Sequence, residues 1–280
     1  MILTKLDISF EFFPPITKLG KKNLLISIDK LIKFNPKFFS ITFGACGNKN
    51  TFDTVLKIKN KCLYVNIVPH LSCISIKRNE LINLLYKYKV SGIKSIVVLR
   101  GDKYYNNYIA ELHYANELIQ FIRDESGNYF ELIVGAYPEM HSEAFNFEKD
   151  LNNFANKMKV GANKAITQYF YDARAYFNFI ECLKKIGFEK PIIPGIMPIN
   201  NFNKISHFSN ICGASIPRWI CKKFEAYGDD NKSAIEFSKE IMIKICKNLI
   251  EGGAPGLHFY TLNNVEPSIA ILHELKNIIY

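Results

Sequence analysis

The stretch Ser-Phe-Glu-Phe-Phe-Pro-Pro at residues 9–15 places one carboxyl group, Glu11, among aromatic and proline side chains. Such surroundings desolvate a carboxylate and favour its protonated form. A carboxyl group that keeps its proton near neutral pH is suited to donate it in general acid catalysis. The residues alone leave an equally good alternative, in which Glu11 lies at a strand edge and faces water.

A second stretch, Leu-Arg-Gly-Asp at residues 99–102, combines opposite charges with a glycine. A glycine lets the backbone approach a ligand closely, and Arg100 and Asp102 on either side of Gly101 offer a cation and an anion to it. Taken alone, the stretch fits a tight turn with a local ion pair at least as well.

Two further polar groups follow apolar runs. Gln168 carries both a hydrogen-bond donor and an acceptor, which suits recognition of an amide-like ring edge. His141, in Tyr-Pro-Glu-Met-His at residues 137–141, is by itself more typical of an ordinary loop histidine. The sequence contains no GxGxxG, P-loop, GxSxG, HExxH or CxxC pattern, which argues against a Rossmann nucleotide site, a serine hydrolase and a zinc site. We therefore expect no metal.

Eight short apolar runs alternate with longer amphipathic segments. Most of the runs are rich in Val, Ile, Phe and Tyr, as strands buried on both faces require. They cover residues 6–13, 38–43, 64–71, 95–99, 131–137, 164–170, 192–197 and 256–262. Helical periodicity is found between them at residues 77–90, 111–125, 147–160, 173–186 and 233–251, and a further helix is expected at 200–210.

Eight β-then-α units predict a (β/α)₈ barrel, the TIM barrel, as a single domain over residues 1–280. An open doubly wound sheet is the alternative. Residues 214–231 do not fit the alternation and predict an extra helix and loop before the last strand. In a barrel, functional groups lie at the carboxyl ends of the strands. The polar residues there are Glu11, Thr42, His70, Arg100 to Asp102, Tyr137, His141, Gln168, Thr261 and Asn263.

The composition is that of an ordinary globular protein, with 48% hydrophobic and 22% charged residues. The formal charge of +10 raises the alternative of a nucleic-acid binder. Only five of the basic residues are arginine, and the lysines are spread along the chain, so we expect no nucleic-acid surface. No apolar run is long enough to cross a bilayer and no signal peptide is evident, so a cytoplasmic location without membrane contact is expected.

Taken in order, these motifs closely resemble the bacterial methylenetetrahydrofolate reductase family. The resemblance extends over nearly the whole chain and rests on eight stretches in the same order as in the family. They are residues 10–15, 40–45, 69–73, 99–102, 137–141, 161–163 with 166–168, 193–196 and 258–263.

The resemblance implies a homo-oligomeric FAD enzyme of one-carbon metabolism. NAD(P)H, in bacteria usually NADH, would reduce the flavin and leave, and 5,10-methylenetetrahydrofolate would then accept the hydride and become 5-methyltetrahydrofolate for methionine synthesis. Glu11 would be the general acid, and Asp102 would favour the cationic form of the folate. Residues that would contact the substrates are Thr42, Asp102, Gln168, Lys204, Phe208 and Leu262. Residues that would hold FAD are Phe43, Ala45, His70, Arg100, Gly101, Asp102, Tyr114, Ala115, Tyr137, His141, Ala144, Asp150, Asn153, Asn156 and Lys157.

Three positions depart from the family pattern. Asn264 stands where the family commonly has an Arg that holds folate, Lys204 stands in place of a Gln, and Asn156 stands in place of an Arg that contacts the FAD phosphates. We interpret Lys204 as a partial replacement for the positive charge lost near the folate tail. The departures also leave an alternative open, in which the protein is a barrel that binds FAD but no longer catalyses the reaction.

Overall fold

The structure, a computed structural model, describes residues 6–43, 48–74, 76–101 and 111–279. Its strands form one sheet in the order β7-β6-β5-β4-β3-β2-β1-β9-β8. Because β7 and β8 are consecutive in the chain, the two ends of this order meet, and the fold is a (β/α)₈ barrel. The strands are β1 (Asp7–Phe12), β2 (Phe38–Ile41), β3 (Asn66–Ser72), β4 (Ser95–Leu99), β5 (Glu131–Ala136), β6 (Lys164–Thr167), β7 (Ile192–Ile193), β8 (Gly195–Ile196) and β9 (Gly256–Tyr260).

The strands pair in parallel, as strands joined by helical crossovers must. In β1 and β2, Phe10 lies opposite Phe39 and Glu11 lies opposite Ser40. All four residues of β2 are buried, which explains its unbroken apolar sequence. The predicted run at 95–99 matches β4. The run predicted at 64–71 begins two residues before β3 and ends one residue short of it, and the remaining runs extend up to three residues past the observed ends. The predicted strand at 192–197 is divided into β7 and β8 at Pro194. Proline has no N–H for the ladder, but the Pro194 carbonyl still accepts from the His258 N–H at 3.0 Å.

Gly195 in β8 is a position where only the absence of a side chain allows the packing. A Cβ built there would collide with the Thr167 carbonyl and the Tyr260 ring. These two groups are themselves joined, because the Tyr260 hydroxyl donates to the Thr167 carbonyl at 2.7 Å.

We expect Gly195→Ala to lower the free energy of unfolding by about 2–4 kcal/mol, because overpacking here meets backbone rather than a flexible side chain. Gly187→Ala is the matched control. Gly187 has a φ of +75° with no atom near its Cβ position, so that variant pays only the left-handed backbone cost of about 1–2 kcal/mol. Denaturant unfolding of both variants checks the prediction, and equal losses would contradict it.

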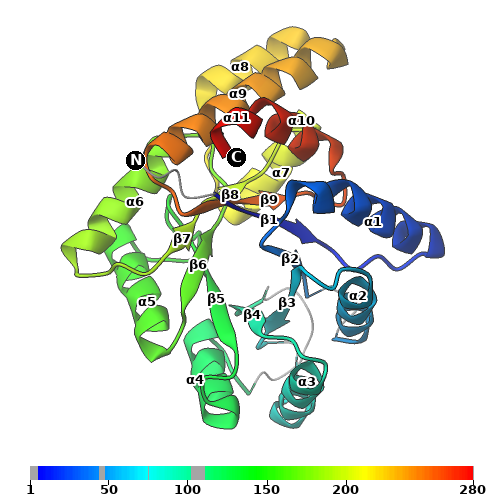
Figure 1. Ribbon diagram of the computed structural model, residues 1–280. Helices are drawn as coiled ribbons and strands as arrows, with labels where there is room; N and C mark the ends of the chain where they lie inside the picture. The colour runs from blue at the N-terminus through cyan, green and yellow to red at the C-terminus, as the bar shows by residue number, and fades with distance from the viewer. Residues whose placement is uncertain (1–5, 44–47, 75, 102–110, 280) are drawn as a thin grey trace. The chain divides into compact units, whose positions relative to one another are not determined.

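The helices alternate with the strands along the chain (Figure 1). They are α1 (Lys18–Leu31), α2 (Asn48–Lys61), α3 (Arg78–Val90), α4 (Ala115–Ser126), α5 (Phe147–Val160), α6 (Ala173–Lys185), α7 (Phe202–Cys212), α8 (Arg218–Tyr227), α9 (Asn231–Glu251), α10 (Glu266–Glu274) and α11 (Lys276–Ile279), with a short 3₁₀ helix, η1 (Ile32–Phe34), after α1. The predicted helix at 147–160 matches α5, whereas α4 begins four residues later than predicted. The helix predicted at 200–210 lies at 202–212, because Asn201 caps its start and accepts from the Lys204 N–H at 3.0 Å.

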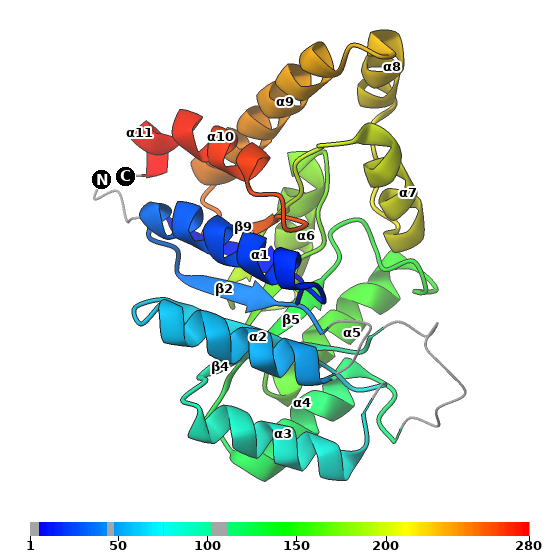
Figure 2. The ribbon, with the colours of Figure 1, turned by 90° about the vertical axis from the view of Figure 1, so that its right-hand side faces the viewer.

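The expected extra helix before the last strand is confirmed as α8. Figure 2 shows that α7 leads into α8 and that the chain then turns back along α9. Aromatic side chains hold these helices together. Phe202 of α7 stacks on Phe224 of α8 with ring centroids 4.7 Å apart, and Phe224 meets Phe237 of α9 at 5.3 Å.

The chain forms two compact units. Unit 1 comprises Met1–Ile8, Ala136–Asn153 and Ile166–Tyr280, and unit 2 comprises Ser9–Gly135 and Phe154–Ala165. Each unit therefore carries its own strand ends and loops, which are described separately below. That the chain acts as one catalytic domain stays a prediction.

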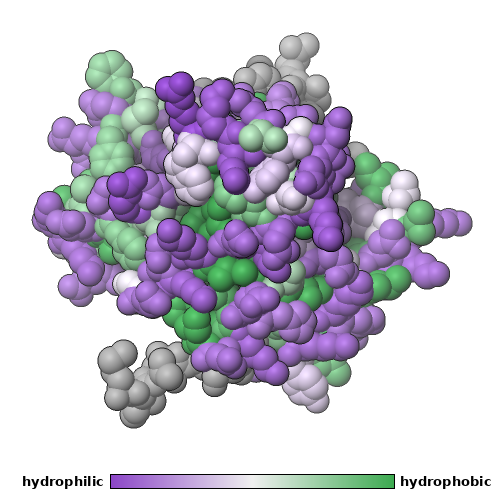
Figure 3. Space-filling model, turned by 90° about the horizontal axis from the view of Figure 1, so that it is seen from above, coloured by the Kyte–Doolittle hydropathy of each residue, from purple (hydrophilic) through white to green (hydrophobic). Residues whose placement is uncertain are grey.

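Apolar side chains are exposed on the α7–α9 segment of unit 1. Ile211, Trp219 and Ile235 are all more than half exposed. The face seen in Figure 3 is largely hydrophilic, with apolar residues between the polar ones. The predicted homo-oligomer stays a prediction.

Among the described residues, no helix combines the length and the hydropathy that a membrane span needs.

Candidate active site

In unit 2, a glutamate and a histidine meet near the ends of β1 and β3, the two strands on either side of β2. Glu11 is the fifth residue of β1, and His70 lies near the end of β3. The Glu11 Oε2 atom is 3.3 Å from His70 Nε2, close enough for an ion pair but without hydrogen-bond geometry, and the side chains are only 17% and 7% exposed. A carboxyl group and an imidazole therefore lie together and largely shielded from water, where a general acid is expected.

The Arg-Gly segment after β4 is held against the end of β3. The Arg100 carbonyl accepts from the Ser72 hydroxyl at 2.9 Å and from the Cys73 thiol at 3.3 Å. Gly101 has a φ of +92°, and a Cβ there would collide with Ser72 Oγ. The packing of Gly101 against Ser72 therefore requires a glycine, and the approach of a ligand to this backbone stays a prediction.

Thr42 and Phe43, the first residues after β2, are both half-buried. Thr42 continues the strand pairing, since its N–H donates to the Phe12 carbonyl at 2.9 Å, and its own carbonyl accepts from the Thr51 hydroxyl at 3.0 Å. Two predicted site residues, Ala45 and Asp102, lie outside the described residues.

The remaining predicted cofactor residues of unit 2 lie on α4 and α5. Tyr114 and Ala115 mark the start of α4, where the Glu117 carboxylate accepts from the Tyr114 N–H at 3.4 Å. The Lys157 ammonium donates to the Gly135 carbonyl at 2.7 Å, and this places a positive charge beside the end of β5. Asn156, one residue earlier in α5, is exposed.

In unit 1, the loop after β5 is fixed by its own polar groups. The His141 N–H donates to the Asp150 carboxylate at 2.8 Å, and its ring lies edge-on to Tyr137 with centroids 4.5 Å apart. The His141 carbonyl accepts from the Ala144 N–H at 2.9 Å. One connected loop and helix start thus contains four predicted cofactor residues, Tyr137, His141, Ala144 and Asp150. A fifth, Asn153, is exposed on α5.

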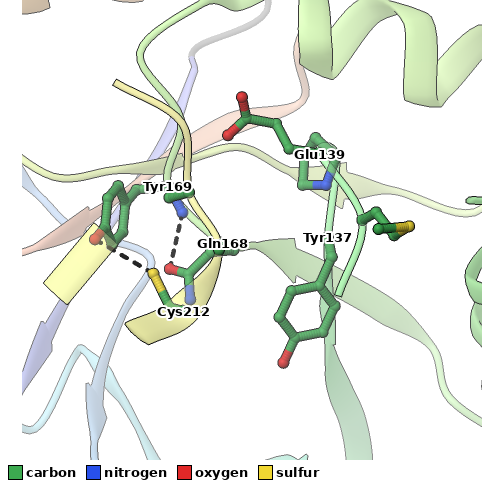
Figure 4. A pocket seen from close by; sticks show the side chains of 9 residues that line it. Tyr137, Glu139, Gln168, Tyr169 and Cys212 are labelled. Atoms are coloured by element: carbon green, nitrogen blue, oxygen red, sulfur yellow. Dashed lines mark hydrogen bonds between the residues drawn. The ribbon is translucent and has the colours of Figure 1, made fainter. Parts of the chain in front are cut away.

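A small hollow in unit 1 contains Gln168, which follows β6. The hollow is lined by Tyr137, Pro138, Glu139, Met140, Gln168, Tyr169, Cys212, Gly213 and Ala214. Two hydrogen bonds position Gln168. Its backbone N–H donates to the Ala136 carbonyl at 2.7 Å, and its side-chain Oε1 accepts from the Tyr169 N–H at 3.0 Å. Figure 4 shows Gln168 beside Cys212, with the Tyr137 ring on one side and Tyr169 on the other.

Glu139 and Tyr169 contribute a half-buried carboxyl group and a buried phenol to the lining of the hollow. Burial raises the pKa of the Glu139 carboxyl group, while the hydrogen bond that it accepts from Ser215 partly offsets the rise. Burial likewise raises the pKa of the Tyr169 phenol. Its hydroxyl lies 3.0 Å from Ser209 Oγ and accepts from the Cys212 thiol at 3.4 Å. At neutral pH the phenol is therefore a neutral hydrogen-bonding group.

Backbone strain is found in two loops that follow strands of unit 1. Met140 after β5 has a φ of +82°, and Leu262 and Asn263 after β9 have φ values of +49° and +58°. Left-handed conformations are costly for side chains such as Met and Leu, and they cluster at functional sites because the surrounding structure must enforce them. Leu262, a predicted substrate residue, lies at such a position.

The two predicted substrate residues on α7 differ in exposure. Lys204 is exposed in the first turn, and Phe208, one turn further on, is 43% exposed. Asn264, which departs from the family pattern after β9, is exposed and donates from its N–H to the Thr261 carbonyl at 2.8 Å.

The structure brings together Glu11 with His70 in unit 2, and Tyr137 with His141 and Asp150 in unit 1. Glu11 and Gln168 belong to different units, so their convergence on one ligand stays a prediction. Sequence reasoning gave no role to Glu139, Tyr169, Ser209 or Cys212. Glu139 stands in a quoted motif, but no sequence signal links it to Ser215, 76 positions away.

Comparison with known proteins agrees with the resemblance read from the motifs. The family model described as methylenetetrahydrofolate reductase matches residues 3–276. The chain is 39% identical over 279 residues to a 5,10-methylenetetrahydrofolate reductase of Buchnera aphidicola subsp. Baizongia pistaciae, covering 99% of this chain and 93% of that protein. It is 36% identical over 272 residues to the enzyme of that name from Escherichia coli strain K12, covering 97% and 91%.

Among solved structures, an uncharacterized protein from Clostridium thermocellum, described as binding two copies of 5-methyl-5,6,7,8-tetrahydrofolic acid, shares the fold. The TM-score is 0.72 at 19% identity, and the match covers 99% of this chain and 97% of that one. A 2,3-dimethylmalate lyase shares only the barrel, with a TM-score of 0.54 at 8% identity over 99% of this chain and 80% of that one. Since the family model and these relatives span nearly the whole chain, the protein is an enzyme that belongs to the methylenetetrahydrofolate reductase family.

Proposed function

We propose that this protein is a flavoenzyme that uses NAD(P)H, preferably NADH, to reduce 5,10-methylenetetrahydrofolate to 5-methyltetrahydrofolate in two separate half-reactions. The observation that carries the proposal is the family match over residues 3–276 together with a shielded carboxyl group, Glu11, at a strand end. The product would supply methyl groups for methionine synthesis in the cytoplasm.

The residues of each unit fit a flavin dinucleotide by their donor types. In unit 2, Arg100 and Lys157 are cations at strand ends, and Gly101 lets the backbone after β4 lie close against Ser72. Phosphates favour cationic groups and the starts of helices, such as the start of α4 at Tyr114 and Ala115. In unit 1, the Tyr137 and His141 rings and the Asp150 and Asn153 side chains offer stacking and polar contacts. FAD, when bound, would supply the hydride chemistry between the reductant and the folate.

The protein's own groups would act on the folate. Glu11 would donate its proton to the folate nitrogen that is released when the five-membered ring opens, and His70 lies beside it. Asp102 would favour the cationic iminium form of the opened folate. Gln168 would orient the folate ring through its amide, and Thr42, Phe208 and Leu262 would complete the substrate contacts.

Spectroscopy followed by separate half-reactions tests this function. The purified protein should show flavin absorption in the visible range, NADH should bleach it under anaerobic conditions, and methylenetetrahydrofolate should restore it. Loss of the colour on dilution would measure the weaker FAD retention that we expect from Asn156. Bleaching by NADH without reoxidation by the folate would instead support the degenerate barrel, and a protein that binds no flavin would refute the proposal.

We expect Lys204→Gln to raise the KM for methylenetetrahydrofolate about two- to fivefold, since an exposed charge contributes about 0.2–1 kcal/mol. The physical reason is the loss of an attraction to the negatively charged folate tail, so the effect should shrink at high salt. NADH oxidation with an artificial acceptor should not change. Lys247→Gln, which removes an exposed charge from α9, is the control. An unchanged folate KM for Lys204→Gln would reject the role of Lys204.

A further inference from the structure

One hydrogen bond in unit 1 joins two loops that are far apart in the chain. Glu139, three residues after β5, accepts from the Ser215 N–H at 3.0 Å, across 76 positions of sequence. Ser215 lies between α7 and α8. The same loops also touch at a second place, because a Cβ at Gly213, which caps α7, would lie 3.4 Å from the Ser142 Cβ atom.

The carboxyl end of α7 is also held from the β6 side. The Tyr169 hydroxyl, which follows β6, lies 3.0 Å from Ser209 Oγ and 3.4 Å from the Cys212 sulfur. Ser209 and Cys212 are both in the last turn of α7. Tyr169 is only 3% exposed, so its contacts with Ser209 and Cys212 are buried in the packing of unit 1. The end of α7 is thus tied to the β6 segment by Tyr169 and to the β5 loop by Glu139.

We propose that Glu139 is a positioning residue that holds the end of α7, and with it Phe208, at the hollow lined by Gln168 and Cys212. Phe208 directly precedes Ser209, so a movement of this last turn moves the Phe208 ring as well. This inference rests on the proposed function, in which Phe208 and Gln168 contact the substrates. It adds to that function a residue that acts through α7 and touches neither substrate nor cofactor.

The hydrogen bond between Glu139 and Ser215 can be removed by a single substitution. The Glu139 carboxylate is half-buried and receives the Ser215 N–H, which has no other hydrogen bond partner among those identified in the described residues. Methionine has nearly the volume of glutamate but no acceptor, so Glu139→Met leaves that N–H without its partner at little cost in shape. Glutamine keeps an acceptor oxygen at the same distance from the backbone. The pair of variants therefore separates the hydrogen bond from both the volume and the charge.

Steady-state kinetics and thiol labelling of the holoenzyme test the proposal. We expect Glu139→Met to raise the KM values for NADH and methylenetetrahydrofolate about tenfold, the loss expected for one hydrogen bond to a charged group, with kcat within about threefold. Flavin content should not change, because none of the predicted FAD residues lies on α7 and the His141 N–H in the β5 loop keeps its bond to the Asp150 carboxylate. N-ethylmaleimide should modify Cys212, identified by peptide mass spectrometry, about tenfold faster than in the unchanged protein.

Glu139→Gln should stay within about twofold of the unchanged protein in each measurement, and so should Glu148→Met, which removes an exposed charge nearby on α5. Ser215→Pro removes the donor N–H from the other loop and should reproduce Glu139→Met, which keeps the test decisive if that variant does not fold. Equal behaviour of Glu139→Met and Glu139→Gln would overturn the proposal. If the unchanged protein lacked turnover, the proposed function would fail, and Cys212 labelling would still decide whether Glu139 holds α7.

Discussion

Glu11→Gln should slow the folate half-reaction by about 10²- to 10⁴-fold, the usual contribution of a general acid. Glutamine has nearly the same shape as glutamate and can fill the site beside His70, 3.3 Å away, but its amide cannot deliver a proton. The reduction of bound flavin by NADH requires no such proton, so its rate should change by less than about threefold. Rapid-mixing measurement of the two half-reactions separates these effects.

The matched control is Glu131→Gln, the same substitution at the opposite, amino-terminal end of a strand. Glu131 begins β5, accepts from the Ser95 hydroxyl at 3.0 Å and pairs with Lys164 at 3.0 Å. Because barrel chemistry takes place at the carboxyl ends of the strands, both half-reactions should keep their rates in this variant. If Glu11→Gln reduced the folate as fast as the unchanged protein, Glu11 would not be the acid.

Arg123→Met should lower the free energy of unfolding of the protein by about 3–4 kcal/mol, at the high end for a single substitution. Arg123, in the last turn of α4, donates to the Gly161 carbonyl from Nε at 3.1 Å and from Nη2 at 2.6 Å. Its Nη1 atom donates to the carbonyls of Gly127 at 3.0 Å and Phe130 at 2.9 Å. Methionine replaces the aliphatic part of the side chain but leaves these carbonyls without a donor.

The network extends one step further, which explains the expected size of the effect. Arg123 Nη2 also donates to Asn163 Oδ1 at 2.8 Å, and the same oxygen accepts from the Leu132 N–H in β5 at 2.8 Å. One guanidinium thus connects the end of α4, the start of β5 and the turn before β6. Arg123→Lys should recover only part of the loss, because an ammonium group cannot donate in so many directions.

Arg174→Met provides the comparison for Arg123→Met. Arg174 pairs with Asp172 through a side chain that is 86% exposed, and such surface ion pairs contribute little to stability because water screens them. Thermal or denaturant unfolding should therefore rank Arg123→Met far below Arg174→Met in stability. Equal stabilities would mean that water replaces the Arg123 donors without cost.

Much of the fold could be read from local pattern. Residues 95–99, Ser-Ile-Val-Val-Leu, are mostly β-branched and apolar, and they form β4 with the same bounds. The helix predicted at 147–160 has the same bounds as α5 because its apolar residues, such as Phe154 and Met158, recur at helical spacing and are buried. Helix ends were less predictable. Asn201 moved the start of α7 by two residues, because capping depends on one side-chain hydrogen bond rather than on periodicity.

The amino-acid sequence by itself determined the alternation of strands and helices, the family, and the polar residues that follow the strands, because these depend on local spacing and on short motifs. Tertiary structure alone decided which of those residues meet. Glu11 contacts His70, Glu139 contacts Ser215, and Arg123 contacts Gly161, each across tens of positions. Only the tertiary structure also enforces the left-handed backbone at Leu262. Such contacts require a specific side-chain conformation on each of two elements, and that is set by packing, which no single stretch of sequence contains.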